Sequence, residues 1–168
     1  PMVSGMQRDA VAAQVEAALK DGARLLYCSS VPSTEGNWFP VTVLSSLRQS
    51  MAIQTCETFG PVVSLASFDG SEAEAVRLAN DTEYGLAAYV YTTDPRRAQR
   101  VAAGIKAGQV GINCYTMTNA HLECPWVGHK GSGMGYHSGA DGWRQFSLPK
   151  SVVFDQSIPA PLTVFSSL

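Results

Sequence analysis

Strand-like and helix-like segments alternate through the middle of the chain, from about residue 62 to residue 113. Two helix-initiation signals lie in this stretch, at Ser71 and at Asp94-Pro95. Such alternation favours right-handed crossover connections and a sheet with helices packed on it. The predicted fold class is therefore α/β, with a mostly parallel sheet and flanking helices. The apolar runs expected to be strands here are 62–68, 87–91 and 109–113.

The two helices in this stretch have predicted beginnings and ends. Ser71 and Glu74 have the spacing of a capping box, in which the serine side chain accepts a hydrogen bond from the third helical amide while the glutamate reaches back to the cap. Asp94 precedes a proline at the first helical position, and this second helix should continue through Ile105. Gly108 is placed to end it.

The N-terminal region predicts one amphipathic helix and two strands. The helix should run from about residue 7 to residue 21, with Gly22 closing it. Strands are expected at 24–27 and 40–44, since both are short apolar runs. The apolar side chains expected on one face of the helix are Val11, Val15, Ala18 and Leu19.

The regular alternation stops after residue 113. A loop with glycine and aromatic residues follows, and a final strand is expected at 152–154. The glycines of 131–135 do not complete the dinucleotide-binding fingerprint, because Tyr136 stands where its third glycine is required and the preceding sequence is loop-like. We interpret them as a structural turn that needs positive φ or close backbone approach, with phosphate binding as the weaker alternative.

Length and charge limit the classes of partner. The 168 residues, 45% of them hydrophobic, are enough for one compact globular unit. A net charge of −2 and the lack of a basic run argue against nucleic acid as a partner. No window approaches the roughly 18 to 20 apolar residues of a membrane span, and no secretory signal opens the chain, so we expect a soluble cytoplasmic protein. The closing Ser166-Ser167-Leu168 resembles a peroxisomal address without its basic residue, which is a weaker alternative.

The cysteines and histidines give weak chemical signals. The four cysteines are spaced too widely for a disulfide scaffold, so reduced thiols are expected. Cys114 and Cys124 are candidate nucleophiles, but Cys114 ends an apolar strand and is better explained as a small buried side chain, and Cys124 lies in a loop. The spacing near the histidines matches no zinc pattern well, and we predict no metal site. The residues considered for one are His121, Glu123, Cys124, His129 and His137.

Several sequence blocks follow one another in a fixed order. They are Glu57-Thr58-Phe59-Gly60-Pro61, Asn80-Asp81-Thr82-Glu83-Tyr84-Gly85-Leu86, Gly108-Gln109-Val110-Gly111-Ile112-Asn113, and Gly142-Trp143-Arg144-Gln145-Phe146 with Lys150. Together they resemble the C-terminal part of the catalytic domain of an NAD(P)-dependent aldehyde dehydrogenase. Pro125-Trp126-Val127-Gly128 departs from the usual Pro-Phe-Gly-Gly, and Cys56 replaces a common acid.

The resemblance implies positions for cofactor and substrate. Glu57 corresponds to the glutamate that accepts hydrogen bonds from the hydroxyls of the nicotinamide ribose, and Phe59 to the ring that packs beside the nicotinamide of NAD or NADP. Tyr115 and Trp126 correspond to the loop that lines the aldehyde entrance. The resemblance also implies a partial catalytic domain over residues 1–154, whose final strand pairs across subunits in a homo-oligomer, and a tail over 155–168.

The resemblance also implies what this chain lacks. The family's nucleophilic cysteine, its general-base glutamate and its dinucleotide-binding domain correspond to sequence upstream of Pro1, so no catalytic residue is assigned in the chain. We therefore expect the C-terminal portion of an enzyme that oxidises an aldehyde to a carboxylic acid, inactive by itself and completed by the missing N-terminal part. The alternative is a non-catalytic binding or oligomerisation module of the same family.

Overall fold

The computed structural model describes residues 1–33, 35–115 and 123–153. The predicted tail with Ser166-Ser167-Leu168, Phe154 and His121 lie outside the described residues. In the described part of the chain, no helix is both long and apolar enough to cross a membrane. The helices are α1 (Gly5–Lys20), α2 (Ala52–Thr55), α3 (Glu72–Asn80), α4 (Pro95–Gly104) and the 3-10 helix η1 (Gly142–Phe146). The strands are β1 (Arg24–Cys28), β2 (Thr42–Ser45), β3 (Val62–Ser64), β4 (Tyr84–Gly85), β5 (Ala87–Val90), β6 (Gln109–Ile112), β7 (Trp126–Val127), β8 (His129–Lys130) and β9 (Tyr136–His137).

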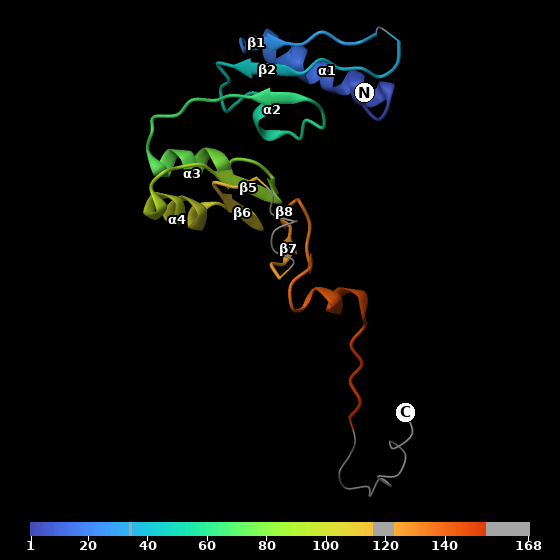
Figure 1. Ribbon diagram of the computed structural model, residues 1–168, viewed down its shortest axis with the longest axis vertical. Coiled ribbons are helices and arrows are strands. Elements are labelled where there is room, and N and C mark those ends of the chain that lie inside the picture. The colour runs from blue at the N-terminus through green and yellow to red at the C-terminus, as the bar shows by residue number, and fades with distance from the viewer. Residues whose placement is uncertain (34, 116–122, 154–168) are drawn as a thin grey trace, which may run out of the picture.

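The parallel strand pairs are divided between two sheets. In the first, β2 pairs antiparallel with β1 and parallel with β3. In the second, β5 pairs parallel with β6 through the crossover helix α4. Figure 1 shows α1 and α2 with the first sheet and α3 and α4 with the second. Short antiparallel pairs, β4 with β8 and β7 with β9, follow them. The α/β class is confirmed.

Helix α1 begins and ends at clear capping residues. The Ser4 side chain accepts a hydrogen bond from the Gln7 amide at 3.1 Å, which satisfies one free donor of the first turn. At the other end, Gly22 has a φ of 96°, and the amides of Gly22 and Ala23 donate to Leu19 and Ala18. This is a Schellman ending, and the glycine is needed because left-handed backbone is costly for other residues.

The hydrophobic core lies between α1, β2 and the segment around α2. Leu44 is fully buried at the centre of β2, and Met51 and Val15 pack in the same cluster. Val11, Val15 and Ala18 are buried, as predicted from helical spacing. Leu19 was expected on this face but is exposed. It follows the buried Ala18 directly, and one residue further along an α-helix is a rotation of about 100°, which turns Leu19 away from the core.

Helix α3 uses half of the predicted capping box. The Ser71 side chain accepts from the Glu74 amide at 3.2 Å. Glu74 does not reach back, because its carboxylate pairs with Arg77 one turn later at 2.7 Å. Asp69 takes its place and accepts from the Ser71 amide at 2.8 Å, and that hydrogen bond lowers the pKa of Asp69. The helix therefore starts where the sequence predicts, with a different second cap.

An ion cluster joins α3 to α4. Glu72 in the first turn of α3 accepts two hydrogen bonds from Arg100, at 2.7 and 2.8 Å, and one from Arg97 at 3.3 Å. The bidentate contact with Arg100 is the largest cause of a pKa for Glu72 of about 2, below its ordinary 4.5. The two helices are thereby linked across 25 and 28 residues of sequence.

Glu72→Gln should remove part of the acid sensitivity of this chain. A carboxyl whose pKa is lowered on folding adds stability above its unfolded pKa, and that stability is lost as the pH falls from 4.5 towards 2. We expect wild type to be more stable than the variant at pH 7 and the difference to shrink towards pH 2.5, measured by urea unfolding at each pH. Glu16→Gln, at an exposed position of α1, is the control and should show no such convergence. A pH-independent difference for Glu72→Gln would contradict the assignment.

Helix α4 begins as predicted but does not end at the predicted glycine. Asp94 Oδ1 accepts from the amides of Arg96 and Arg97 at 2.9 and 3.1 Å, with Pro95 at the first helical position. The helix stops at Gly104, where a Cβ would lie 2.9 Å from Val76 of α3. Gly108 has another role. A Cβ there would lie 1.8 Å from the carbonyl oxygen of Val127, so it permits β7 to approach the start of β6.

Two predictions about the C-terminal region have different outcomes. The 131–135 loop is a turn, since Gly133 and Gly135 have φ values of 115° and 84°, and the amides of 131–133 donate to protein carbonyls. The final strand is absent from the described residues, because Val152 and Val153 have no strand partner there. Both side chains are exposed. Because the expected partner strand belongs to another subunit, the pairing of this segment stays a prediction.

Candidate functional site

The turn at 57–61 connects α2 to β3 and is held by α1. Gln14 Nε2 donates to the Glu57 carbonyl at 3.1 Å, and Gln7 Nε2 donates to the Phe59 carbonyl at 3.0 Å. Gly60 lies so close to Val11 that a Cβ would meet its methyl groups at 3.0 Å. The backbone of the turn is therefore fixed, while the side chains of Glu57 and Phe59 remain exposed.

Glu57 lies at a cleft of about 400 Å³. The same cleft is lined by Tyr84, Gly85 and Leu86 and the start of β5, which we call the cleft wall. The charge of Glu83, then partial burial, then the charge of Glu57 raise the pKa of Tyr84 above its ordinary value. The remaining lining residues are Ala79, Thr82, Ala87, Ala88, Ile105, Lys106, Ala107 and Ser132.

The cleft wall is fixed by the loop around β8. Lys130 Nζ donates to the carbonyls of Asn80 and Thr82, both at 3.0 Å, and so binds the C-terminal end of α3. Ser132 Oγ accepts from the Gly85 amide at 3.0 Å. Lys130 and Ser132 have no predicted role from the sequence, because their partners lie 47 to 50 residues away and two-residue strands produce no periodic signal.

The Asn80 side chain joins the same loop to the end of α4. Its Nδ2 donates to the Gly104 carbonyl at 2.9 Å, and its Oδ1 accepts from the Lys106 amide at 2.7 Å. Asn80 therefore fixes the ends of both helices on one side of the cleft. The sequence predicts only a helix-terminating residue at this position.

Lys130→Met should loosen the cleft wall. The variant keeps the aliphatic stem but loses both charge-assisted hydrogen bonds, and we expect a loss of about 1 kcal/mol in the free energy of unfolding after discounting for solvent exposure. Amide hydrogen exchange at 84–86 should become faster, as measured by mass spectrometry. Lys150→Met, at an exposed position, is the control and should leave both quantities unchanged. Unaltered exchange in Lys130→Met would show that the ammonium group does not fix the wall.

The two predicted entrance residues lie in separate aromatic pairs. Tyr115 stacks on Tyr89 of β5 with ring centroids 5.4 Å apart. Trp126, half-buried on β7, lies 5.2 Å from the ring of His137. Among the described residues, neither ring forms an aromatic pair or a hydrogen bond with Glu57 or Phe59, and neither lines the cleft at Glu57. The structure therefore groups Glu57 with the cleft wall and leaves the entrance residues apart.

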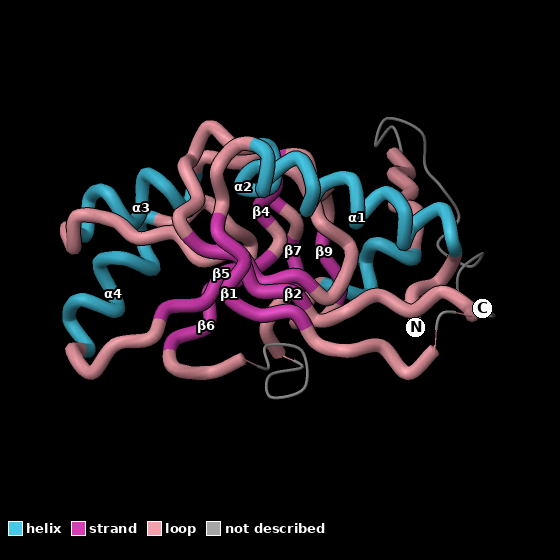
Figure 2. The backbone as a smooth tube through the Cα atoms, turned by 90° about the horizontal axis from the view of Figure 1, so that it is seen from above, coloured by secondary structure: helices cyan, strands magenta, loops and turns pink. Residues whose placement is uncertain are grey.

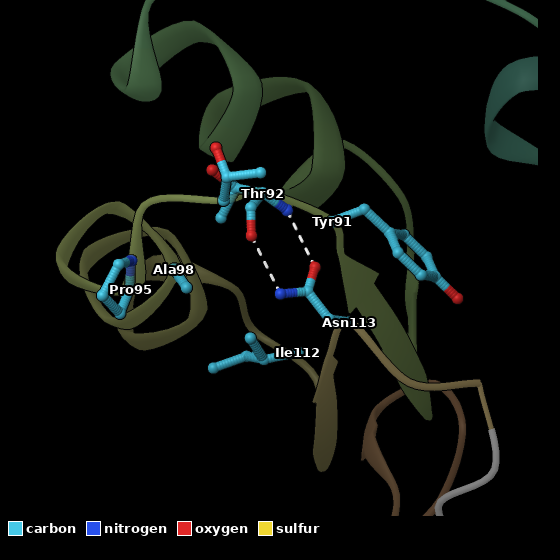
Figure 3. A pocket seen from close by; sticks show the side chains of 7 residues that line it. Tyr91, Thr92, Pro95, Ala98, Ile112 and Asn113 are labelled. Carbon is cyan, nitrogen blue, oxygen red and sulfur yellow. Dashed lines mark hydrogen bonds between the residues drawn. The ribbon is translucent and has the colours of Figure 1, made fainter.

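Asn113 marks the point where the predicted entrance loop leaves the sheet. It has a φ of 52°, and its side-chain amide pairs with the backbone of Thr92, accepting from the amide at 2.9 Å and donating to the carbonyl at 2.8 Å (Figure 3). An open hollow of about 670 Å³ lies beside this pair, at the N-terminus of α4. The polar groups of Asn113 are thus used to end β6.

The described cysteines and histidines form no cluster. All four cysteines are free and exposed, including Cys114, whose predicted burial is wrong. It lies beyond the end of β6, where the chain has already turned away from the sheet. Among the residues with described positions, no group of three or more histidine, cysteine, aspartate or glutamate side chains could hold a metal ion. His121, one of the residues considered for a metal, is outside that set.

The fold and the acidic turn at a cleft agree with a family match along the chain. Residues 1–152 match the profile described as the aldehyde dehydrogenase family. The chain belongs to the aldehyde dehydrogenase family.

Its relatives include a betaine aldehyde dehydrogenase of Sinorhizobium fredii, 39% identical over 90% of this chain and 31% of that protein. The solved betaine aldehyde dehydrogenase of Staphylococcus aureus in complex with NAD+ is 33% identical, with a TM-score of 0.83, over 99% of this chain and 33% of that one. Lactaldehyde dehydrogenase of Escherichia coli is 31% identical, with a TM-score of 0.79, over 87% and 30%. The chain thus spans about a third of the length of these relatives.

Proposed function

We propose that this chain is the C-terminal portion of the catalytic domain of an NAD(P)-dependent aldehyde dehydrogenase, which oxidises an aldehyde to a carboxylic acid. The observation that carries the proposal is the rigid 57–61 turn, which presents Glu57 at a cleft. On this proposal residues 1–154 form part of the catalytic domain and residues 155–168 its tail. The nucleophile, the general base and the dinucleotide-binding domain belong to the remaining part of the enzyme, so the chain alone is inactive.

Glu57 is the proposed ligand of the nicotinamide ribose. A carboxylate offers two acceptor oxygens to a vicinal diol, and the Glu57 carboxylate is exposed, with no hydrogen-bond partner among the described residues. Its backbone is held by Gln14, so the acceptor is positioned before the cofactor binds. Phe59, also exposed, is proposed to shield the hydride-transfer region from water. When bound, NAD or NADP supplies the hydride acceptor.

The proposed substrate is an aldehyde that enters past Tyr115 and Trp126. Two aromatic faces suit a quaternary ammonium group, because ring quadrupoles attract cations. Relatives that are named betaine aldehyde dehydrogenases support this class. Betaine aldehyde should therefore be preferred over 3,3-dimethylbutanal, its neutral isostere, in a completed enzyme.

The experiment measures formation of reduced nicotinamide. The chain is assayed alone and after co-expression with the part of the Sinorhizobium fredii relative that lies outside the match, with NAD or NADP and both aldehydes. We expect no turnover by the chain alone and turnover by the pair. In the pair, Glu57→Gln should lower kcat/KM for the cofactor at least tenfold, chiefly because the cofactor KM rises. Turnover by the chain alone that is lost in Cys124→Ser would refute the proposal that the nucleophile lies in the remaining part of the enzyme.

A second candidate is a non-catalytic module of the same family, which binds a longer homologue or a second copy. It is favoured by the exposed Val152 and Val153, which are 62% and 91% exposed at the predicted pairing strand. A complex that forms with a longer homologue and leaves its turnover unchanged would favour this candidate. A gain of turnover on complex formation would exclude it.

A further inference from the structure

The ring of Trp126 has one aromatic neighbour on the adjacent strand. Trp126 on β7 and His137 on β9 are register partners of an antiparallel pair, and Figure 2 shows the two strands side by side. Directly opposite residues of such a pair project to the same face. Here the two ring centroids lie 5.2 Å apart, with an angle of 44° between the ring planes. Among the described residues, no other aromatic ring pairs with Trp126.

The turn after β9 packs on the segment that leads into β7. Ser138 and Gly139 have φ values of 65° and 74°, so the chain reverses sharply after His137. A Cβ at Gly139 would lie 3.2 Å from the backbone nitrogen of Pro125, the residue before Trp126. The backbone of Trp126 is therefore held next to β9 by contacts that do not involve the His137 side chain.

The side chain of Trp126 is less constrained than its backbone. It is half-buried, and its indole N–H forms no hydrogen bond among the described residues. A ring without a hydrogen bond changes rotamer unless another side chain packs against it. His137 supplies that packing, and its Nδ1 lies 3.3 Å from Ser138 Oγ, within hydrogen-bond distance. The orientation of the indole ring therefore depends on the imidazole of His137.

We propose that His137 is a positioning residue that fixes the Trp126 ring and thereby sets the preference for a cationic over a neutral aldehyde. This inference rests on the proposed function, in which the aldehyde passes Trp126. Attraction between a cation and an aromatic ring is directional, because the cation must lie over the ring face. Burial of an apolar group is not directional. A ring held in one orientation therefore favours a quaternary ammonium group, whereas a ring that rotates loses this attraction and keeps most of its apolar contact.

The preference between two aldehydes tests this role. The kcat/KM values for betaine aldehyde and 3,3-dimethylbutanal are measured with the pair of this chain and the remainder of the Sinorhizobium fredii relative, and their ratio is compared between variants. In His137→Ala we expect this ratio to fall about fivefold, the size expected when one aromatic pair is lost, with the cofactor KM unchanged. His137→Phe restores a ring and should keep the ratio. Met134→Ala, which truncates a fully exposed side chain just before β9, is the control and should also keep it.

An unchanged ratio in His137→Ala would overturn the proposal. So would an equal loss of kcat/KM for both aldehydes, because that result indicates general damage to the site rather than a lost orientation. Trp126→Ala separates this inference from the proposed function. A ratio that survives in Trp126→Ala would reject the proposed aldehyde entrance, whereas a ratio lost in Trp126→Ala and kept in His137→Ala would reject only the role of His137.

A spectroscopic readout needs no turnover. The near-ultraviolet circular dichroism of the chain alone reports how rigidly its tryptophan rings are held, and Trp126→Phe identifies the contribution of Trp126. We expect His137→Ala to weaken this contribution and His137→Phe to retain it. A spectrum of His137→Ala equal to that of the wild type would overturn the proposal. A weakened contribution together with a pair that gives no turnover would reject the proposed function and support the positioning of the ring by His137.

Discussion

Replacing Leu44 by alanine should lower the free energy of unfolding by about 3 kcal/mol, because Leu44 is fully buried and its neighbours cannot close the cavity. It lies on the central strand of the first sheet and packs in the cluster with Met51 and Val15. Domains of ordinary stability have only about 5 to 15 kcal/mol in total, so this loss should lower the midpoint of urea unfolding strongly. The measurement is urea denaturation followed by circular dichroism.

Leu148→Ala is the matched control for that substitution. It removes the same atoms from a side chain that is 96% exposed, and its effect should remain within about 0.5 kcal/mol. A loss for Leu44→Ala no greater than that of the control would mean that α1 and β2 do not share a stabilising core.

Gly108→Ala should destabilise the chain by about 3 kcal/mol, the upper part of the usual range for overpacking. An added Cβ would lie 1.8 Å from the carbonyl oxygen of Val127 and 2.6 Å from its carbonyl carbon. Both are backbone atoms, so no rotation of a side chain can relieve the clash and β7 must move away from β6. The expected result is a lower urea midpoint, together with altered near-ultraviolet circular dichroism from Trp126, which lies on β7.

Gly5→Ala is the control for Gly108→Ala. At this first residue of α1 the nearest atom to an added Cβ is Asn37 Oδ1 at 3.5 Å, which is ordinary contact. Alanine is a better helix former than glycine, so this variant should be neutral or more stable by up to about 1 kcal/mol. If Gly108→Ala behaved in the same way, the close approach of β7 and β6 would be refuted.

Capping and periodicity predicted the longer helices well. Asp94-Pro95, Ser71 and Gly22 act within a few residues of themselves, so their hydrogen bonds form where the sequence places them. The end of α4 was not predictable in this way. Gly104, its last residue, lies so close to Val76 of α3 that an added Cβ would be 2.9 Å from it, and a contact between two helices leaves no local signal in the sequence.

In the candidate site, too, some features are predicted by the local sequence and others depend on contacts between distant segments. The block containing Glu57 and Phe59 is visible in the sequence through its resemblance to the family. The hydrogen bonds by which Lys130 and Ser132 fix the cleft wall are not visible in the sequence, because they join residues 47 to 50 positions apart. Burial is also non-local, which explains why Cys114 and Leu19 are exposed against expectation.

The sequence by itself determined the α/β class, the end of α1 at Gly22, the starts of α3 and α4, and the family of this chain. These features rest on local hydrogen bonds, on the period of apolar residues and on contiguous motifs, all of which are encoded within short windows. Only the tertiary structure decided which strands pair, which glycines permit close approach and which carbonyls Lys130 binds. Those features depend on contacts between distant segments, whose geometry exists only after the chain has folded.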